Sequence, residues 1–342
     1  MSSIAPIIDR RKISLNYLRG KVIAFDANNM LYQFLALIRM PNGSPLRDRE
    51  GRVTSHLVGL AYRTTRIMLE YDIRPVFIFD GKPVTLKREE LEKRREARDK
   101  ASREWIEALR RGDYRTAFSK AVVSSRLTSS MINDAKKFLD LAGIPYIDAF
   151  ADAEAQAAYM ARKGDVWAVG SRDYDSILYG SPRLVRYITI SGTDFLPSKG
   201  VIKPLTPELI ELDTVLKNLN INRRQLIDIA ILIGTDFNKG VYGIGPKKAL
   251  KLIKIYGCIE KLPSNILEKI PKNFNEVRNI FLNPRVIKEY SIKYRNPRKE
   301  ELYQFLVEER SFSKEKAEKI IERLEKISFK LRQTSIDLWL NK

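Results

Sequence analysis

Short apolar segments that end in an acidic residue recur along the chain. They lie at 21–25, 75–79 and 166–170, and each has the length of a buried strand. Segments with a helical pattern separate them, at 54–71, 85–111 and 129–142. Strands that alternate with helices predict an α/β fold, in which helices flank a central and mainly parallel sheet on both faces.

The acidic residues that follow these runs form the first candidate site. Asp26 ends the first run, Asp80 follows the second, and Asp173 and Asp175 follow the third. A single aspartate at a strand end is commonly a helix cap or a turn residue. Functional groups also collect at the carboxyl ends of parallel strands, and the repetition favours that interpretation.

Three further acids extend the set. Asp152 and Glu154 introduce an Ala-rich helix within 146–163, and Asp236 follows an apolar helix at 225–236. Acids in a first helical turn are ordinarily partners of the helix dipole. If all seven converge, their repulsion raises their pKa values unless cations are bound.

The chemistry of these side chains indicates the kind of cation. Ligands that are all oxygen favour Mg²⁺ or Mn²⁺. Two such ions, ~4 Å apart, can activate a water and stabilise the leaving oxygen in phosphodiester hydrolysis. The acids therefore predict a two-metal hydrolase.

Charge and composition narrow the function further. The chain has 62 Lys and Arg against 42 Asp and Glu, which gives a net charge of +20. This excess favours a polyanionic partner such as nucleic acid, although a solvated, thermophile-type surface is an alternative. His56 and Cys258 are the single residues of their types, which argues against His- or Cys-based catalysis and against a disulfide framework, and predicts an intracellular protein. No apolar stretch approaches the ~20 residues that span a membrane.

Two basic segments are candidates for nucleic-acid contact. From 82 to 112 the chain holds eleven Lys or Arg and seven Asp or Glu, which predicts an exposed helix that is either a salt-bridged surface or a basic cover over the acids. At 241–250, Gly243 and Gly245 allow close backbone approach to a phosphate, and Lys247 and Lys248 add positive charge. A plain turn between helices is the alternative for this second segment.

The C-terminal part of the chain is predicted to be mainly helical. Helical patterns lie at 276–292, 299–309 and 313–331. We expect three parts: a nuclease core at 1–265, C-terminal helices packed on it at 266–331, and a tail at 332–342. The core includes a helical arch at 82–130 and a helix-hairpin-helix-like duplex-binding element at 225–265.

Several motifs together resemble the flap endonuclease family of structure-specific 5′ nucleases, in its archaeal type. They are "FDANNMLYQFL" (25–35), "FDGKP" (79–83), "DAEAQAA" (152–158), "DYDS" (173–176) and "LIGTDFNKGVYGIGPKKAL" (232–250). Their order and spacing are similar to those of the family over residues 20 to 260. The resemblance implies a PIN-like nuclease core and a Mg²⁺-dependent 5′-flap endonuclease and 5′-3′ exonuclease. Such enzymes remove flaps in Okazaki fragment maturation and base excision repair.

The resemblance also implies roles for individual residues. The family's metal-binding acids correspond to Asp26, Asp80, Asp152, Glu154, Asp173, Asp175 and Asp236, of which Asp80 and Asp175 are central to catalysis. The family usually has Glu where this chain has Asp152. Lys87 and Arg94 match the catalytic basic residues of the arch that contact the scissile phosphate. Tyr32 matches an aromatic residue that stacks on the base beside the cut.

Further implications concern cofactors and partners. Two Mg²⁺ ions, replaceable by Mn²⁺, would bind the acids, and K⁺ would bind at Gly243 and Gly245 against flap DNA, alongside Lys247 and Lys248. The tail "QTSIDLWL" resembles a motif that binds the sliding clamp (PCNA), in which a 3₁₀ turn inserts apolar side chains into a pocket. Its positions are Gln333, Ile336, Trp339 and Leu340. The start "MSSIAPII" differs from the family's Met-Gly, and we expect a monomer.

The sequence leaves two alternatives to a flap endonuclease. One is a related 5′ nuclease, such as an exonuclease or a junction resolvase; the long insertion of the nucleotide-excision type is absent from this chain. The other is a DNA-binding adaptor on the sliding clamp without catalysis, which would require an incomplete set of acids.

Overall fold

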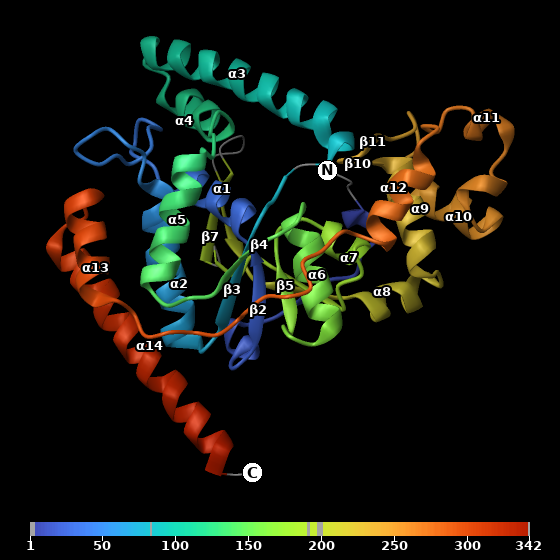
Figure 1. Cartoon of the computed structure of the whole chain (residues 1–342). Helices are drawn as coiled ribbons and strands as arrows, with labels where there is room; N and C mark the ends of the chain where they lie inside the picture. The colour runs from blue at the N-terminus through green and yellow to red at the C-terminus, as the bar shows by residue number, and fades with distance from the viewer. Residues whose placement is uncertain (1–3, 83, 190–191, 197–200, 341–342) are drawn as a thin grey trace.

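A seven-stranded mixed sheet forms the centre of the computed structural model, which describes residues 4–82, 84–189, 192–196 and 201–340 (Figure 1). In spatial order its strands are β1 (Arg11–Lys12), β9 (Glu208–Glu211), β6 (Arg183–Arg186), β5 (Ala168–Gly170), β2 (Val22–Asp26), β3 (Arg74–Phe79) and β4 (Tyr146–Asp148). Neighbours from β6 to β4 pair in parallel, and β9 pairs antiparallel with both β6 and β1. The prediction of a mainly parallel α/β sheet is confirmed.

Both faces of the sheet are covered, which explains why its strands are continuous apolar runs. Ile23 and Phe25 of β2 enter one buried cluster, and Ala24 between them enters another. The helices that contribute to the first cluster are α1 (Ala27–Leu37), α2 (Ser55–Tyr71), α5 (Ser129–Leu141), α13 (Lys299–Tyr303) and α14 (Lys314–Leu340). Those that contribute to the second are α6 (Ala153–Lys163), α7 (Asp175–Leu178), α8 (Leu212–Leu219), α9 (Arg223–Ile233), α10 (Pro246–Tyr256) and α12 (Phe274–Leu282).

The basic segment after β3 forms a long helix that crosses above the carboxyl ends of the strands (Figure 1). This helix, α3 (Arg88–Arg110), has only Ala101 and Ala108 buried, as its charged sequence predicts. It packs against α4 (Tyr114–Val123), whose start is capped by Asp113. We call the segment from Lys82 to Val123, which contains α3 and α4, the arch.

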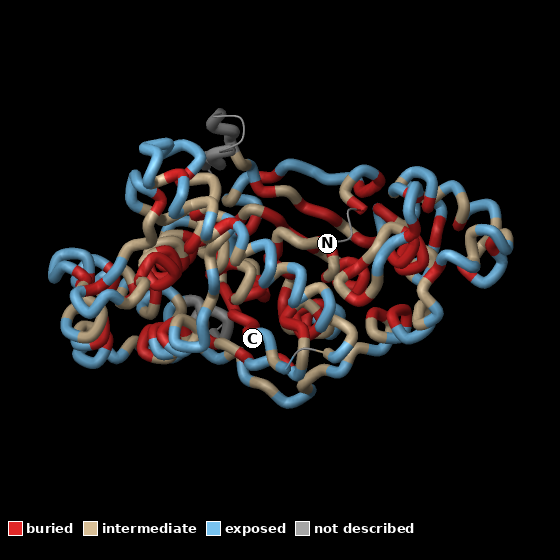
Figure 2. The backbone as a smooth tube through the Cα atoms, turned by 90° about the horizontal axis from the view of Figure 1, so that it is seen from above, coloured by how far each residue is buried: buried red, intermediate tan, exposed pale blue. Residues whose placement is uncertain are grey.

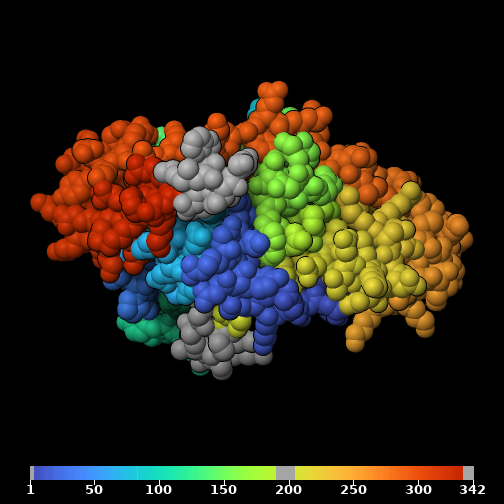
Figure 3. Space-filling view, turned by 90° about the horizontal axis from the view of Figure 1, so that it is seen from below, coloured from blue at the N-terminus to red at the C-terminus, as the bar shows by residue number. Residues whose placement is uncertain are grey.

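Smaller elements complete the chain. They are the hairpin β7 (Gly192–Leu196) and β8 (Val201–Leu205), the hairpin β10 (Gly234–Thr235) and β11 (Asn238–Lys239), and α11 (Ser264–Leu267). Short 3₁₀ helices lie at Ala5–Ile7, Leu15–Leu18, Thr85–Lys87 and Ile259–Lys261, and a π-helix at Gln304–Glu309 follows α13. Figure 2 shows buried backbone in the interior and exposed segments around it. Seen from below, the N-terminal residues lie between the C-terminal helices and the segment around α8 to α11 (Figure 3). Within the described part of the chain, no helix combines the length and the apolar character that crossing a membrane requires.

The predicted helix at 276–292 is wrong in its second half. Helix α12 ends at Leu282, and residues 283–298, which we call the strap, have no regular structure. The strap is held by tertiary partners: the Ile287 N–H donates to Gln156 Oε1 at 2.8 Å, and the Arg295 N–H donates to the Gly143 carbonyl at 2.9 Å. Pro284 directly after α12 is a helix-stopping signal.

Candidate active site

The sheet order brings the predicted acids to one edge. Because β5, β2, β3 and β4 are neighbours, the residues after their carboxyl ends meet beneath the arch. Asp26 ends β2 and Asp80 follows β3. Asp152 follows β4, and Asp173 follows β5. Four of the seven acids therefore share one edge of the sheet.

The other three come from helices that begin or end there. Glu154 lies in the first turn of α6, and Asp175 is the first residue of α7. Asp236 lies between β10 and β11, just after α9. Each of the seven interacts electrostatically with at least one other member or with the basic residues between them. We call this set the acid cluster.

Asparagines at the start of α1 position two of the acids. Asn28 Nδ2 donates to Asp80 Oδ2 at 2.8 Å, and Asn29 Nδ2 donates to Asp173 Oδ2 at 2.7 Å. Asp26 Oδ1 accepts the Asn29 N–H at 2.9 Å, so this acid also caps α1. Sequence reasoning missed both asparagines, although two adjacent amides in the first turn of an apolar helix were a visible signal.

Helix α6 receives its cap from a different strand. Asp152 stands at its N-cap position but makes no side-chain cap bond. Asp80 Oδ1 instead accepts the N–H of Ala153 at 2.9 Å. The acids after β3 and β4 are thereby tied to one another through the helix start.

Two basic residues at the base of the arch reach into the acid cluster. Lys87 Nζ lies 2.6 Å from Asp152 Oδ1, and Arg94 Nη2 lies 2.8 Å from Asp236 Oδ1. Arg94 also bonds to Glu90 one helical turn earlier, at 3.0 Å. Burial opposes the charge on Lys87, but Asp152 and further acids outweigh it and raise its pKa. Both side chains are therefore cationic.

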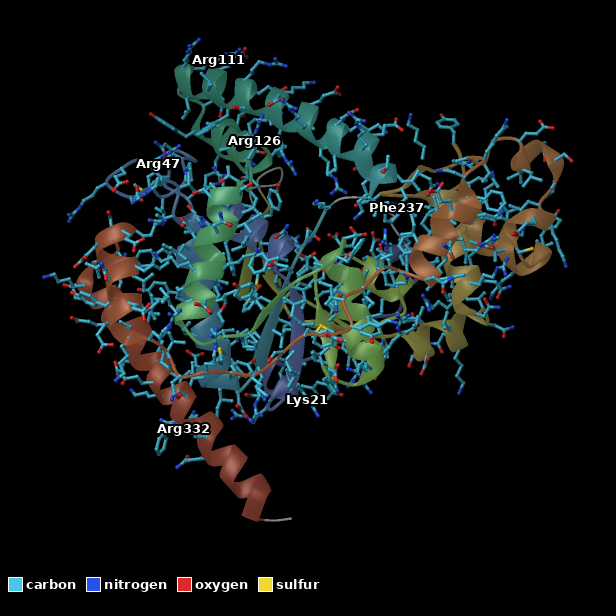
Figure 4. The ribbon with its side chains drawn as sticks, viewed as in Figure 1. Lys21, Arg47, Arg111, Arg126, Phe237 and Arg332 are labelled. Atoms are coloured by element: carbon cyan, nitrogen blue, oxygen red, sulfur yellow. The ribbon has the colours of Figure 1, made fainter. Side chains whose placement is uncertain are left out.

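The other oxygen of Asp152 is also occupied. Tyr179, which is 2% exposed, donates its hydroxyl to Asp152 Oδ2 at 2.6 Å. Its ring packs on Phe281 of α12, with centroids 4.9 Å apart, and Phe281 packs on Phe237 at 5.4 Å. The Lys87 ammonium lies 5.0 Å from the Phe237 ring centroid, and Figure 4 shows Phe237 beneath the right-hand end of α3. Sequence reasoning missed Tyr179, since nothing local marks it as a partner of Asp152.

The negative charge of the cluster exceeds the positive charge that Lys87 and Arg94 supply. Burial, followed by repulsion from Asp236 and Asp173, raises the pKa of Asp175 to about 7. Burial and repulsion from Asp175 raise the pKa of Glu154 well above its usual range, although Ser171 donates to its Oε1 at 2.7 Å. Asp236 differs: burial opposes ionisation, but Arg94 and Lys87 lower its pKa.

This donor set fits hard divalent cations. The seven side chains offer only oxygen, and the raised pKa values of Asp26, Glu154 and Asp175 express a deficit of positive charge that such ions remove. As they stand, however, no three Asp, Glu, His or Cys side chains among the described residues form a group ready to hold a metal ion. Lys87 and Arg94 occupy the oxygens of Asp152 and Asp236, so some carboxylates must reorient for an ion to bind.

A hollow of about 270 Å³ opens beside the acid cluster, under α3. We call it the Tyr32 hollow. Tyr32 of α1 lines it together with Asp80, Lys87 and Arg94. The Arg98 guanidinium lies 5.1 Å from the centroid of the Tyr32 ring. Aromatic and cationic groups therefore stand next to the acids, as a site for a nucleic-acid strand requires.

The glycine-rich turn lies apart from the acid cluster. Gly243 has φ of +76° and Gly245 caps α10, and a Cβ at either position would meet nothing within 4 Å. Tyr242 is fully exposed, and Lys248 Nζ donates to the Gly243 carbonyl at 3.3 Å. Lys247 is in the first turn of α10. The turn thus presents backbone and cations on an open surface.

The candidate clamp-binding residues lie at the far end of the chain. Helix α14 continues to Leu340 and projects from the body (Figure 1), so positions 333–340 are α-helical here rather than a 3₁₀ turn. Gln333 is exposed. The side chains of Ile336, Trp339 and Leu340 lie outside the described residues, as do residues 1–3 with the unusual N-terminus.

Comparison with known proteins bears directly on the family. Residues 1–101 match the XPG N-terminal domain, and residues 143–236 match the XPG I-region. The catalytic core of Rad2 in complex with a DNA substrate has the same fold, with a TM-score of 0.67 at 24% identity over 94% of this chain and 97% of that one.

More similar proteins cover nearly the whole chain. Flap endonuclease 1 of Caldivirga maquilingensis is 50% identical over 96% of this chain and 95% of the relative. Flap endonuclease 1 of Archaeoglobus fulgidus is 46% identical over 99% of each. The solved structure of flap endonuclease-1 from Methanococcus jannaschii has a TM-score of 0.76 at 41% identity, over 96% of this chain and 98% of that one. The chain belongs to the flap endonuclease 1 family.

Proposed function

We propose that this chain hydrolyses the phosphodiester at the base of a 5′ flap in DNA, and that the acid cluster is where the cut occurs. Its family makes it a metal-dependent, structure-specific nuclease of DNA replication and repair. The observation that supports the site most directly is the convergence of strand-end acids with Lys87 and Arg94 of the arch.

Lys87 and Arg94 would bind the scissile phosphate. Their present partners are Asp152 and Asp236, so they are already oriented into the acid cluster. A phosphate oxygen is a comparable acceptor, and it gains negative charge as the bond breaks. The two side chains would therefore exchange carboxylate for phosphate when DNA enters.

The acids would hold two Mg²⁺ ions, with Mn²⁺ as a substitute. Such ions supply charge neutralisation and an activated water when they are bound. The asparagines and the cap bonds described above fix Asp26, Asp80 and Asp173 beforehand. Tyr179 would keep its hydrogen bond to Asp152 when Lys87 exchanges Asp152 for the phosphate.

The duplex beside the flap would lie on the turn at Gly243 and Gly245. No Cβ blocks backbone approach there, and Lys247 and Lys248 stand at the helix start. We place K⁺ at this turn as well. Lys248 Nζ now bonds to the Gly243 carbonyl and would have to move before that carbonyl could bind the ion.

The C-terminal end of α14 would bind a sliding clamp through Gln333, Ile336, Trp339 and Leu340. Its projection from the body supports this, because the segment can be reached without disturbing the sheet (Figure 1). Replacing Trp339 with alanine should abolish co-elution with the clamp while leaving cleavage of flap DNA in its absence unchanged. Unchanged co-elution would reject this assignment.

Cleavage of an end-labelled double-flap DNA tests the main proposal. With Mg²⁺ we expect one product cut near the junction, which is lost with EDTA and with Asp175→Asn. The variant should still bind the flap DNA, because Lys87, Arg94 and the turn are intact. Comparison with nicked and four-way junction DNA separates a flap endonuclease from a related 5′ nuclease. Tight binding without any cut, in Mg²⁺ or Mn²⁺, would refute the proposal.

A further inference from the structure

A second hollow, of about 420 Å³, lies on the other side of Asp152 from the Tyr32 hollow. Ala151 and Asp152 line both, so the loop that carries them separates two spaces that flank the acid cluster. The second hollow is bounded by the start of the arch at Lys82, by the loop at Phe150, and by the end of α12 with Arg285 of the strap. We call it the Phe150 pocket. Nothing in the proposed catalysis uses it.

Phe150 is unusual among the aromatic residues of the sheet edge because it is 45% exposed. The Arg285 guanidinium lies 4.2 Å from its ring centroid, and both side chains line the pocket. An aromatic ring next to a guanidinium plane is a surface on which nucleic-acid bases stack. Lys82 adds a second cation, while Glu276 is the pocket's carboxylate besides Asp152.

The loop that carries Phe150 is fixed by close backbone packing. The Gly81 N–H donates to the Ala151 carbonyl at 2.7 Å. A Cβ at Gly81 would lie 2.1 Å from the Ala149 carbonyl oxygen, so only glycine permits this approach. The backbone around Phe150 is thus held in place by Gly81, the residue that follows Asp80.

We propose that the Phe150 pocket binds the first unpaired nucleotide of the 5′ flap, with its base against Phe150 and Arg285. This rests on the proposed function, which puts the scissile phosphate at the acid cluster, and on the resemblance, which implies that the base beside the cut stacks on Tyr32 in the adjoining hollow. A strand that crosses the acids from the Tyr32 hollow must continue on the opposite side of Asp152. The Phe150 pocket is the space there, and its volume falls in the usual range of ligand pockets, ~300–1,000 Å³.

The test pairs changes in the protein with changes in the flap. Double-flap DNA is made with a normal nucleotide or with an abasic residue at the first flap position, and separately at the second. Dissociation constants are measured by fluorescence anisotropy in EDTA, and single-turnover cleavage is measured in Mg²⁺. The proteins are wild type, Phe150→Ala, Arg285→Ala and the control Phe329→Ala, which removes an exposed phenylalanine of α14.

For wild type, we expect the abasic residue at the first position to weaken binding by about fivefold or more, the scale of one stacked base. The same change at the second position should have little effect. Phe150→Ala should weaken binding of the normal flap to a similar extent and should show no further loss with the abasic flap. Arg285→Ala should behave in the same way with a smaller change, and Phe329→Ala should match wild type.

Two results would overturn the inference. One is equal binding of normal and abasic flaps by wild type. The other is additive loss in Phe150→Ala with the abasic flap, which would mean that Phe150 acts through the fold instead of through the base. Wild type that cuts the flap but shows either result would leave the proposed function standing. Wild type that does not cut the flap at all would refute the proposed function itself.

Discussion

Two groups of acids in this chain differ in how their negative charge is balanced. Between α9 and α12, Asp228 is fully buried and Arg278 is 4% exposed, and their side chains bond at 2.7 Å. Glu260 also bonds to Arg278, at 2.6 Å, and the Ile259 N–H donates to Asp228 at 3.3 Å. This network balances each charge with a partner of opposite sign.

The acid cluster beneath the arch is not balanced in this way. Hydrogen bonds with Arg278 lower the pKa of Glu260 to about 2, whereas burial and neighbouring acids raise the pKa of Asp175 to about 7. The negative charge of Glu260 is thus balanced by the chain itself, while the acids proposed to bind metal are left short of positive charge. The difference lies in the balance of charge, because Asp228 and Glu260 share Arg278, whereas the seven acids of the cluster share Lys87 and Arg94.

The largest effect should come from breaking the balanced network. Arg278→Met leaves Asp228 buried without a counter-charge, and we expect a loss of ~3–5 kcal/mol in the free energy of unfolding. Chemical denaturation measures it. The control Arg295→Met removes an exposed ion pair with Asp140 and should cost ~1 kcal/mol or less. Equal losses of unfolding free energy in both variants would show that the Asp228 network stabilises the fold no more than an exposed ion pair does.

Removing one acid from the unbalanced cluster should have the opposite effect on stability. Asp175→Asn should lower the cleavage rate by ~10²–10³-fold, a scale typical of losing one preorganised group. In EDTA the same variant should be at least as stable as wild type, because it relieves repulsion with Asp236 and Asp173. Thermal unfolding with and without Mg²⁺ measures this. A lower Tm in EDTA would contradict the idea that the cluster is under repulsion.

His56 shows a third arrangement, in which a buried group avoids charge. It is packed in α2 with no exposed surface, and burial lowers its pKa to about 4, from 6.5 in the unfolded chain. Its contribution to stability is therefore complete above pH 6.5 and is lost as the pH falls towards 4. The loss should reach up to about 3 kcal/mol.

His56→Leu tests this directly. Unfolding free energies of wild type and variant, measured between pH 7 and 4, should differ in slope, with the variant less sensitive to acid. Arg310 opposes protonation of His56 while Asp134 favours it, so the measured midpoint reports their balance. Parallel curves would reject the assignment of acid sensitivity to His56.

The smallest effect concerns the hydrogen bond from Tyr179, whose ring packs on Phe281 of α12, to Asp152 of the acid cluster. Tyr179→Phe removes the hydroxyl that holds Asp152, and we expect Mg²⁺ affinity, measured by calorimetry, to fall by ~10-fold. Tyr290→Phe removes a similar bond to Asp165, far from the cluster, and serves as the control. The resemblance implies a glutamate at this position, and its side chain is longer than that of Asp152. In the background of Asp152→Glu, Tyr179→Phe should therefore lower the Mg²⁺ affinity by less. Equal Mg²⁺ affinity in wild type and Tyr179→Phe would deny Tyr179 a positioning role.

The sequence predicted the sheet and the acids for the same physical reason. Buried parallel strands are apolar along their whole length, so the first acid after each strand marks its carboxyl end, as at Asp26 and Asp80. His56, the single histidine, is a packing residue.

The features that could not be predicted from the sequence depend on contacts between residues that lie far apart along the chain. Arg278 pairs with Asp228 across 50 positions and Lys87 with Asp152 across 65, and neither spacing has a local signature. The strap was expected to be helical as far as residue 292. The expectation failed because the hydrogen-bond partners of the strap, such as Gly143 and Gln156, lie far away in the sequence. Pro284 was the one local sign that the helix would stop.

The caps formed by the acids have an evolutionary consequence. Asp26 holds the start of α1, and Asp80 holds the start of α6 through the Ala153 N–H, while both belong to the acid cluster. Under the proposed function, a substitution at either position would be selected against twice, once for its effect on folding and once for its effect on catalysis. Relaxed selection on cleavage alone would therefore not free these positions to drift, and a descendant that had lost its activity would still retain them as a trace of its origin.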